Sequence, residues 1–210
     1  MKLVNGQYEM LFENGGIRIE KDGKTLYFNA RPIYVSVKTI AAVSLFSDVP
    51  YESVETVGDT VVAKGTYESK NGSLFRICDV YCVAGEDFKA EREVTVLKKA
   101  EDDLGFQTKI GFWTKESNAV ADYNYFSPGE WYKHNEYAPS YAQGKNMDAT
   151  YYWRKETYSG LPMFAMQNIA SGETICFSRW DADVVLGSVD RVSSENFVDP
   201  KTNIGSLGVS

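Results

Sequence analysis

The chain has 210 residues, of which 43% are hydrophobic and 14% aromatic, and its 22 Lys and Arg against 29 Asp and Glu give a formal net charge of −7. This length and apolar content exclude a disordered chain and allow a buried core without disulfide bonds. The acidic balance argues against a nucleic acid or an anionic membrane as the main partner, because both select for patches of Lys and Arg.

The first 114 residues alternate between short apolar runs and turn signals, which predicts antiparallel strands joined by hairpins. The clearest turn signal is Asp22-Gly23, a pair that favours the type I′ hairpin. No segment carries the apolar period of a helix. The strands are predicted over residues 17–20, 25–29, 33–38 continuing through 41–46, 52–57, 60–68, 74–83, 88–98 and 104–114.

The alternation is clearest around Arg92. Val94 and Val96 share a face with Arg92, whereas the other face carries Glu91, Glu93 and Thr95. This period of two, with turns every ten or so residues, is typical of an antiparallel meander.

The three cysteines indicate whether the protein belongs to an oxidising or a reducing compartment. Cys78 and Cys82 occupy one predicted strand and lie roughly 13 Å apart along it, beyond the ~7 Å Cα separation that a disulfide spans. Cys176 has no cysteine nearby in the sequence. The thiols are therefore expected to be reduced and buried in a cytoplasmic protein, and the N-terminal residues lack the apolar core of a signal peptide.

The remaining sequence signals exclude several classes of site. No apolar run reaches the ~20 residues of a membrane span, and we expect no membrane partner. The chain holds one histidine and no Cys-x-x-Cys pair, so no metal site is expected. Glycine-rich nucleotide-binding motifs are also absent from the sequence, and we expect no cofactor.

The pattern changes in the second half. Residues 115–160 are aromatic, polar and rich in turn residues, which predicts a long irregular loop region. Alternation returns at 161–168 and 173–180, and 204–210 reads as the opening of another strand. We therefore predict an all-β fold, a single antiparallel β-sandwich domain over residues 1–210 that continues beyond its C-terminal end.

The segment 122–139 combines aromatic rings with carboxylates, amides and the single histidine. Sugars are bound by this mixture, because the C–H face of a pyranose stacks on an aromatic ring while planar polar groups hold its hydroxyls. A second interpretation is that Trp131, Tyr132 and Trp153 anchor a long loop to the sandwich. The candidate carbohydrate-binding residues are Glu130, Trp131, Tyr132, His134, Asn135 and Glu136, with Arg154 beyond them in the sequence.

Catalysis by this chain has weaker support. Glu130 and Glu136 are candidates for the acid and base of a glycosidase, which requires their carboxyl groups to lie ~5 to ~9.5 Å apart across a cleft. His134 is a candidate general base, although a solvated or hydrogen-bonded loop histidine is the simpler interpretation and the one we favour. We therefore predict no catalytic residue in this chain.

The run 125–136, followed by 151–154 and by 161–166, resembles a known domain type. It is similar to the N-terminal β-supersandwich (galactose-mutarotase-like) domain that precedes an (α/α) toroid in multidomain glycoside hydrolases and polysaccharide lyases. The resemblance implies that catalytic groups sit mostly on the toroid and that the loop from Trp131 to Glu136 reaches its cleft. Mutarotases themselves use a histidine and a glutamate on strands, whereas His134 falls in a predicted loop, so epimerase activity is not expected.

The predicted function is a non-catalytic β-sandwich module of a carbohydrate-active enzyme, which supports or lines the saccharide cleft of a separate catalytic domain. Its expected partners are a carbohydrate and a C-terminal helical catalytic domain or partner chain. The alternatives are a free-standing carbohydrate-binding protein and a glycosidase that uses Glu130 and Glu136.

Overall fold

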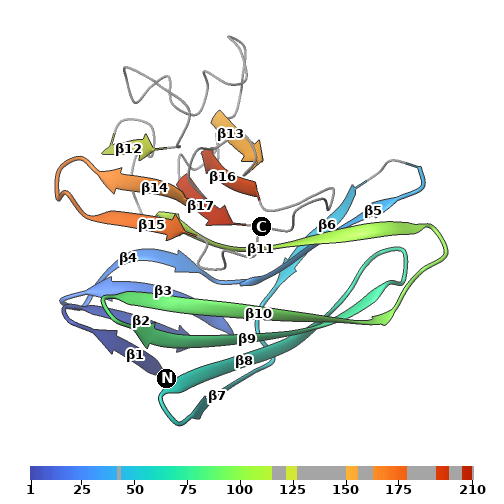
Figure 1. Cartoon of the computed structure of the whole chain (residues 1–210), viewed down its shortest axis with the longest axis horizontal. Coiled ribbons are helices and arrows are strands. Elements are labelled where there is room, and N and C mark those ends of the chain that lie inside the picture. Colours follow the sequence, from blue (N-terminus) through green and yellow to red (C-terminus); the bar gives the residue numbers. More distant parts are fainter. Residues whose placement is uncertain are drawn as a thin grey trace. The chain divides into compact units, whose positions relative to one another are not determined.

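The computed structural model describes residues 1–41, 44–114, 122–126, 150–155, 163–178, 193–198 and 205–209 (Figure 1). Its elements are β-strands in antiparallel sheets, so the prediction of an all-β fold is confirmed. The chain divides into two compact units, residues 1–110 and 111–210. Within the described part of the chain, no helix combines the length and the apolar character needed to cross a membrane.

The first unit contains three groups of antiparallel strands. A meander runs from β1 to β4, β5 pairs with β6 and with β11, and a four-stranded sheet has the order β10-β9-β8-β7. The strands are β1 (Lys2–Asn5), β2 (Tyr8–Glu13), β3 (Gly16–Lys21), β4 (Lys24–Asn29), β5 (Ile33–Thr39), β6 (Ser44–Val49), β7 (Ser53–Val57), β8 (Thr60–Glu68), β9 (Leu74–Ala84), β10 (Asp87–Lys98) and β11 (Asp103–Thr114), the last of which runs across the boundary between the units.

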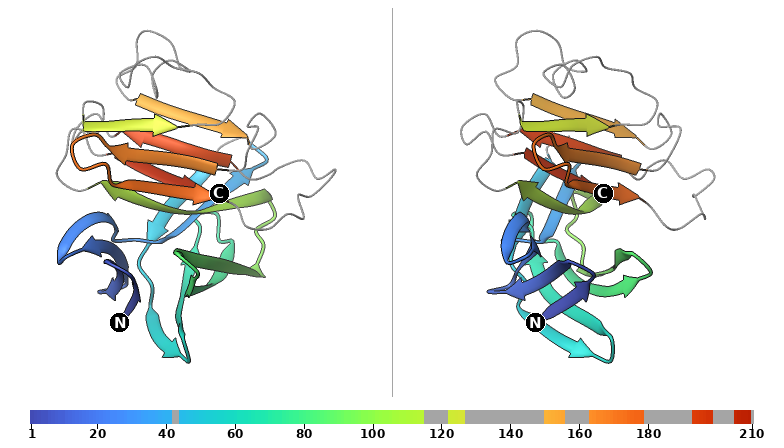
Figure 2. Two further views of the ribbon diagram at one scale, coloured as in Figure 1. Left: turned by 60° about the vertical axis from the view of Figure 1, so that its left-hand side comes forward. Right: turned by 90° about the vertical axis from the view of Figure 1, so that its left-hand side faces the viewer.

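The core of the first unit lies between two layers, seen as the blue meander and the cyan-to-green strands in Figure 2. Burial alternates along β8 and β9, so that every second side chain faces the core. The ring of Phe12 on β2 lies 5.1 Å from that of Tyr81 on β9. Near the other end of β9, Phe75 lies 4.9 Å from Phe106 on β11. Aromatic pairs of this kind add to the apolar burial that holds the layers together.

Turn chemistry sets the register of the meander. Asp22 and Gly23 both have positive φ, 50° and 76°, which is the type I′ turn that the sequence predicts. Asn14 and Gly15 form a similar turn between β2 and β3, with φ of 51° and 75°. Gly15 also accepts a hydrogen bond at its carbonyl oxygen from the Tyr51 N–H, at 2.8 Å. This turn therefore positions the chain around Tyr51.

Two parts of the first unit differ from expectation. The predicted continuous run through 33–46 is a hairpin, because β5 ends at Thr39 and β6 begins at Ser44. The sequence there has no Gly, Asn or Asp to indicate a turn. The strands β1 and β2 were not predicted, although Gly6 marks the turn between them with a φ of 60°. The other strands predicted before residue 115 are present within one or two residues of their predicted ends.

The described strands of the second unit form two groups. One is the sheet β12-β14-β15, and the other is the antiparallel set β13-β16-β17. Two of these strands, β12 and β13, lie inside the 115–160 stretch that was expected to be irregular. The bounds are β12 (Tyr123–Phe126), β13 (Thr150–Lys155), β14 (Met163–Asn168), β15 (Thr174–Ser178), β16 (Ser193–Val198) and β17 (Gly205–Val209).

Candidate functional site

Most of the predicted carbohydrate-binding residues lie outside the described part of the chain. These are the six residues from Glu130 to Glu136 that the sequence singles out. Arg154 lies in β13, where its backbone pairs with Ser194 of β16. The aromatic run that precedes the candidate residues is part of a strand, because Tyr125 and Phe126 belong to β12.

The topology places the candidate run between two strands that belong to different groups. The chain leaves β12, which pairs with β14, and later enters β13, which pairs with β16. Residues 127–149 therefore connect the sheet β12-β14-β15 to the set β13-β16-β17. Connections of this kind carry binding residues more often than the strands they join.

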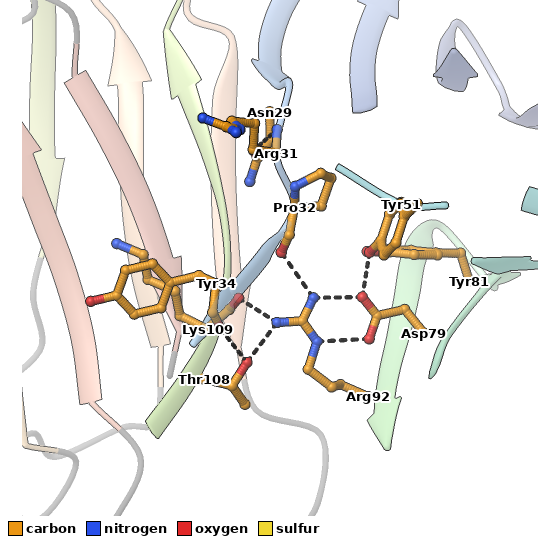
Figure 3. A network of polar contacts seen from close by, with 10 residues as sticks. All are labelled: Asn29, Arg31, Pro32, Tyr34, Tyr51, Asp79, Tyr81, Arg92, Thr108 and Lys109. Carbon is orange, nitrogen blue, oxygen red and sulfur yellow. Dashed lines mark hydrogen bonds and ion pairs between the residues drawn. The ribbon is translucent and has the colours of Figure 1, made fainter. Parts of the chain in front are cut away.

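The best-defined polar site of the described residues is a buried network in the first unit, centred on Arg92 (Figure 3). The guanidinium contacts Asp79 through Nε and Oδ1 at 2.7 Å and through Nη2 and Oδ2 at 2.5 Å. Nη1 donates to Thr108 Oγ1 at 2.8 Å and to the Lys109 carbonyl at 2.6 Å. Nη2 also donates to the Pro32 carbonyl at 3.0 Å. All five N–H groups of the guanidinium are thus engaged.

Two tyrosine hydroxyls extend the hydrogen-bond network around the Asp79 carboxylate. Tyr51 donates its hydroxyl hydrogen to Asp79 Oδ2. The hydroxyls of Tyr51 and Tyr81 are 2.7 Å apart, and since the Tyr51 hydrogen points to the carboxylate, Tyr81 is the donor between them. The side chain of Asp79 is fully buried and that of Arg92 is 6% exposed.

The strands explain how these groups meet. Asp79 and Arg92 are directly opposite each other in the β9–β10 hairpin, on the face of the sheet that points to the core. Thr108 on β11 accepts from Arg92 and donates to the Tyr34 carbonyl of β5 at 2.7 Å. The guanidinium therefore links the β7–β10 sheet to the β5–β11 pair.

Burial controls the ionisation of the network. It raises the pKa of Tyr51 far above its usual value, with Tyr81 and Asp79 adding to the rise. Burial likewise raises the pKa of Tyr81, helped by the charge of Asp79. For Arg92, burial alone would lower the pKa, but the hydrogen bonds and charge of Asp79 outweigh it and raise the pKa above its usual value. The network thus holds neutral phenols around a charged pair.

A closed network of this type has a structural role. Each donor of Arg92 is already bound within the protein, so the guanidinium offers no free N–H to a ligand. A buried pair whose partners are all satisfied holds one arrangement of the layers, and loss of one partner is costly. The sequence places Arg92 on the same strand face as Val94 and Val96 but does not identify Asp79 as its partner. The two-residue turn Gly85-Glu86 was the available signal, because it puts the two residues directly opposite each other.

A second polar cluster joins two turns of the first unit. Ser73 donates from Oγ to Asp103 Oδ2 at 2.7 Å, and the Ala100 N–H donates to Ser73 Oγ at 3.0 Å. Nearby, Asn71 Nδ2 donates to Asp102 Oδ1 at 3.0 Å. These bonds connect the β8–β9 turn to the β10–β11 turn, which also indicates a structural role.

The cysteines are free, as predicted, but the expectation that they are buried is wrong. Cys78 and Cys82 are half-buried and Cys176 is exposed. Strand alternation explains the first two, because Asp79 and Tyr81 occupy the core face of β9 and the cysteines take the other face. In the ranges that the structure describes, no group of three or more His, Cys, Asp or Glu side chains is placed to hold a metal ion.

No family model, no curated protein and no solved structure matches the chain.

Proposed function

We propose that the chain is a non-catalytic β-sandwich module of a carbohydrate-active enzyme, a glycoside hydrolase or a polysaccharide lyase. It supports or lines the saccharide cleft of a helical catalytic domain, carried on the same polypeptide or on a partner chain. The observation that carries the proposal is the position of the candidate run from Glu130 to Glu136 in the connection between β12 and β13. This connection combines stacking rings with planar polar groups, as saccharide recognition requires.

The chemistry of the described residues supports a role without catalysis. Asp79 and Arg92 form a buried charged pair there, and their hydrogen bonds are made to each other and to neighbouring segments of the chain. A general acid or base must instead have a lone pair or a proton available to substrate. The buried carboxylate of Asp79 already accepts hydrogen bonds from Arg92 and Tyr51, so its role is structural.

The proposal is tested by two measurements on the whole chain and by inspection of its gene. On a glycan array we expect the chain to retain a defined class of saccharide. In a hydrolysis or lyase assay on the retained glycan, we expect no turnover by the chain alone. In the gene, we expect a helical domain to be encoded downstream of Ser210 or by a neighbouring reading frame.

Each of the alternatives gives a different pattern. Saccharide binding without any associated helical domain would favour a free-standing carbohydrate-binding protein. Turnover that is lost on Glu130→Gln or Glu136→Gln would favour a glycosidase with its own acid and base. A chain that retains no glycan and has no associated catalytic domain would contradict the proposal.

A further inference from the structure

The edge of the four-stranded sheet in the first unit carries an inference that is independent of the proposed function. The sheet ends at β10 on one side and at β7 on the other. β7 has 5 residues, whereas β10 has 12, and among the described residues β10 pairs only with β9. A long edge strand presents a row of backbone N–H and C=O groups that can pair with another strand.

Burial falls abruptly between β9 and β10. Phe75 and Ile77 on the core face of β9 are fully buried. Their direct partners on β10 are Val96 and Val94, of which Val96 is 45% exposed and Val94 half-buried. The apolar face of β10 therefore extends beyond the layer that covers β9, and a further strand beside it would bury more of this face.

The charges of β10 are arranged for pairing with a second copy of itself. Lys89, Glu91 and Glu93 lie on the outer face of the strand. In an antiparallel pair of β10 strands centred on Glu91, Lys89 of each copy lies opposite Glu93 of the other. The same register places Phe88 opposite Val94 on the core face. Opposite charges and apolar pairs at directly facing positions stabilise a strand pair.

Neighbouring registers are less favourable. A pair centred on Arg92 would place the two guanidinium groups face to face, and a pair centred on Glu93 would place two carboxylates face to face without the lysine contacts. A pair centred on Ala90 would place Lys89 opposite Glu91 twice, but this gain is offset because Asp87 would lie opposite Glu93 twice. Centring on Glu91 brings the two Glu91 carboxylates together, but each is already hydrogen-bonded by Lys89 of its own strand. Like charges that face each other destabilise a strand pair.

We propose that β10 is the interface of a homodimer, in which two copies of the chain pair their β10 strands antiparallel about Glu91 and join their four-stranded sheets into one. The interface uses the backbone edge, the half-buried side chains of Val94 and Phe88, and the two reciprocal contacts between Lys89 and Glu93. It involves one strand from each copy, so the dimer is weak and depends on concentration.

The test is sedimentation of the 210-residue chain over a range of concentrations. We expect a monomer–dimer equilibrium. Glu93→Lys places a lysine opposite Lys89. It should raise the dissociation constant of the dimer about tenfold, because two reciprocal contacts change from attraction to repulsion. Glu68→Lys on β8 makes the same change of charge at an exposed position away from the β10 edge and should leave the dimer unchanged.

The double variant Lys89→Glu/Glu93→Lys restores opposite charges in the same register, and it should return the dissociation constant to within about threefold of the original. Circular dichroism confirms that each variant is folded, as expected for substitutions at solvent-facing positions. A chain that remains monomeric up to about 0.5 mM overturns the proposal. So does a dimer that responds alike to Glu93→Lys and Glu68→Lys, or one that the double variant fails to restore.

Discussion

The first unit and the 115–160 stretch use polar residues in opposite ways. In the first unit the buried network of Arg92 and Asp79 satisfies its polar groups with partners inside the protein. In the 115–160 stretch the polar residues are interleaved with aromatic rings and fall largely between strands β12 and β13. The first region holds the sheets in register, and under the function proposed above the second supplies groups to a saccharide.

The largest loss of stability is expected when one member of the buried pair is removed. Asp79→Ala leaves the Arg92 charge buried without its partner, and we expect the free energy of unfolding to fall by about 3–5 kcal/mol. The matched control is Asp48→Ala, because Asp48 is 3.8 Å from Arg31 in an exposed ion pair and its loss should cost at most about 1 kcal/mol. Urea unfolding measures both, and equal losses would show that the network is not a structural clamp.

The next largest effect is expected at a turn. A Cβ on Gly15 would lie 2.5 Å from the Tyr51 carbonyl oxygen, and its φ is +75°. Gly15→Ala should therefore destabilise the fold by about 2–4 kcal/mol, from backbone strain and steric overlap together. Gly23 has nearly the same φ, +76°, but nothing within 4 Å of its Cβ position. Gly23→Ala should cost only about 1 kcal/mol, and thermal unfolding that ranks the two alike would contradict the role of Gly15 in placing Tyr51.

A smaller effect is expected from removing one hydroxyl of the network. Tyr51→Phe deprives Asp79 of one donor and Tyr81 of its acceptor, which should cost about 1–3 kcal/mol. The control is Tyr8→Phe, since Tyr8 is only half-buried on β2. Comparable losses in chemical denaturation would indicate that the hydroxyl network contributes little.

The sequence anticipates much of the first unit and little of this network. Alternation and the turns Asp22-Gly23 and Gly85-Glu86 set strand positions locally, so β3, β4, β9 and β10 could be predicted. The Asp79–Arg92 contact follows from the second of these turns, but Tyr51 joins it from a segment 28 residues away in sequence. Such a contact depends on how the layers pack, which local patterns do not specify.

The candidate site was less predictable for a different reason. Strands β12, β13 and β16 are short, and their sequences lack the regular alternation that indicates a strand. The run around Trp131 stays a prediction from composition, because aromatic rings beside carboxylates and amides are typical of saccharide binding. Its geometry could not be predicted, since sequence spacing in a connection does not determine distances.

The smallest of these effects appears at high pH. The pKa of Tyr51 is raised by burial, so the folded state favours the neutral phenol, and this stability is present below the unfolded pKa of about 10 and is lost as pH rises above it. Between pH 8 and pH 11 the stability gap between the wild type and Tyr51→Phe should shrink by about 1.4 kcal/mol. Denaturation at both pH values measures the gap, and a constant or widening gap would contradict the neutral-phenol account.

Saccharide binding by the connection between β12 and β13 is tested most directly by isothermal titration calorimetry of the whole chain with a glycan that it retains on the array. Trp131→Ala should lower the affinity at least about tenfold, because a ring that stacks on a sugar supplies much of the apolar contact. Tyr8→Ala removes a half-buried aromatic ring from the first unit and should leave the affinity unchanged. Equal affinities for the wild type and Trp131→Ala would contradict the assignment of saccharide binding to the connection between β12 and β13.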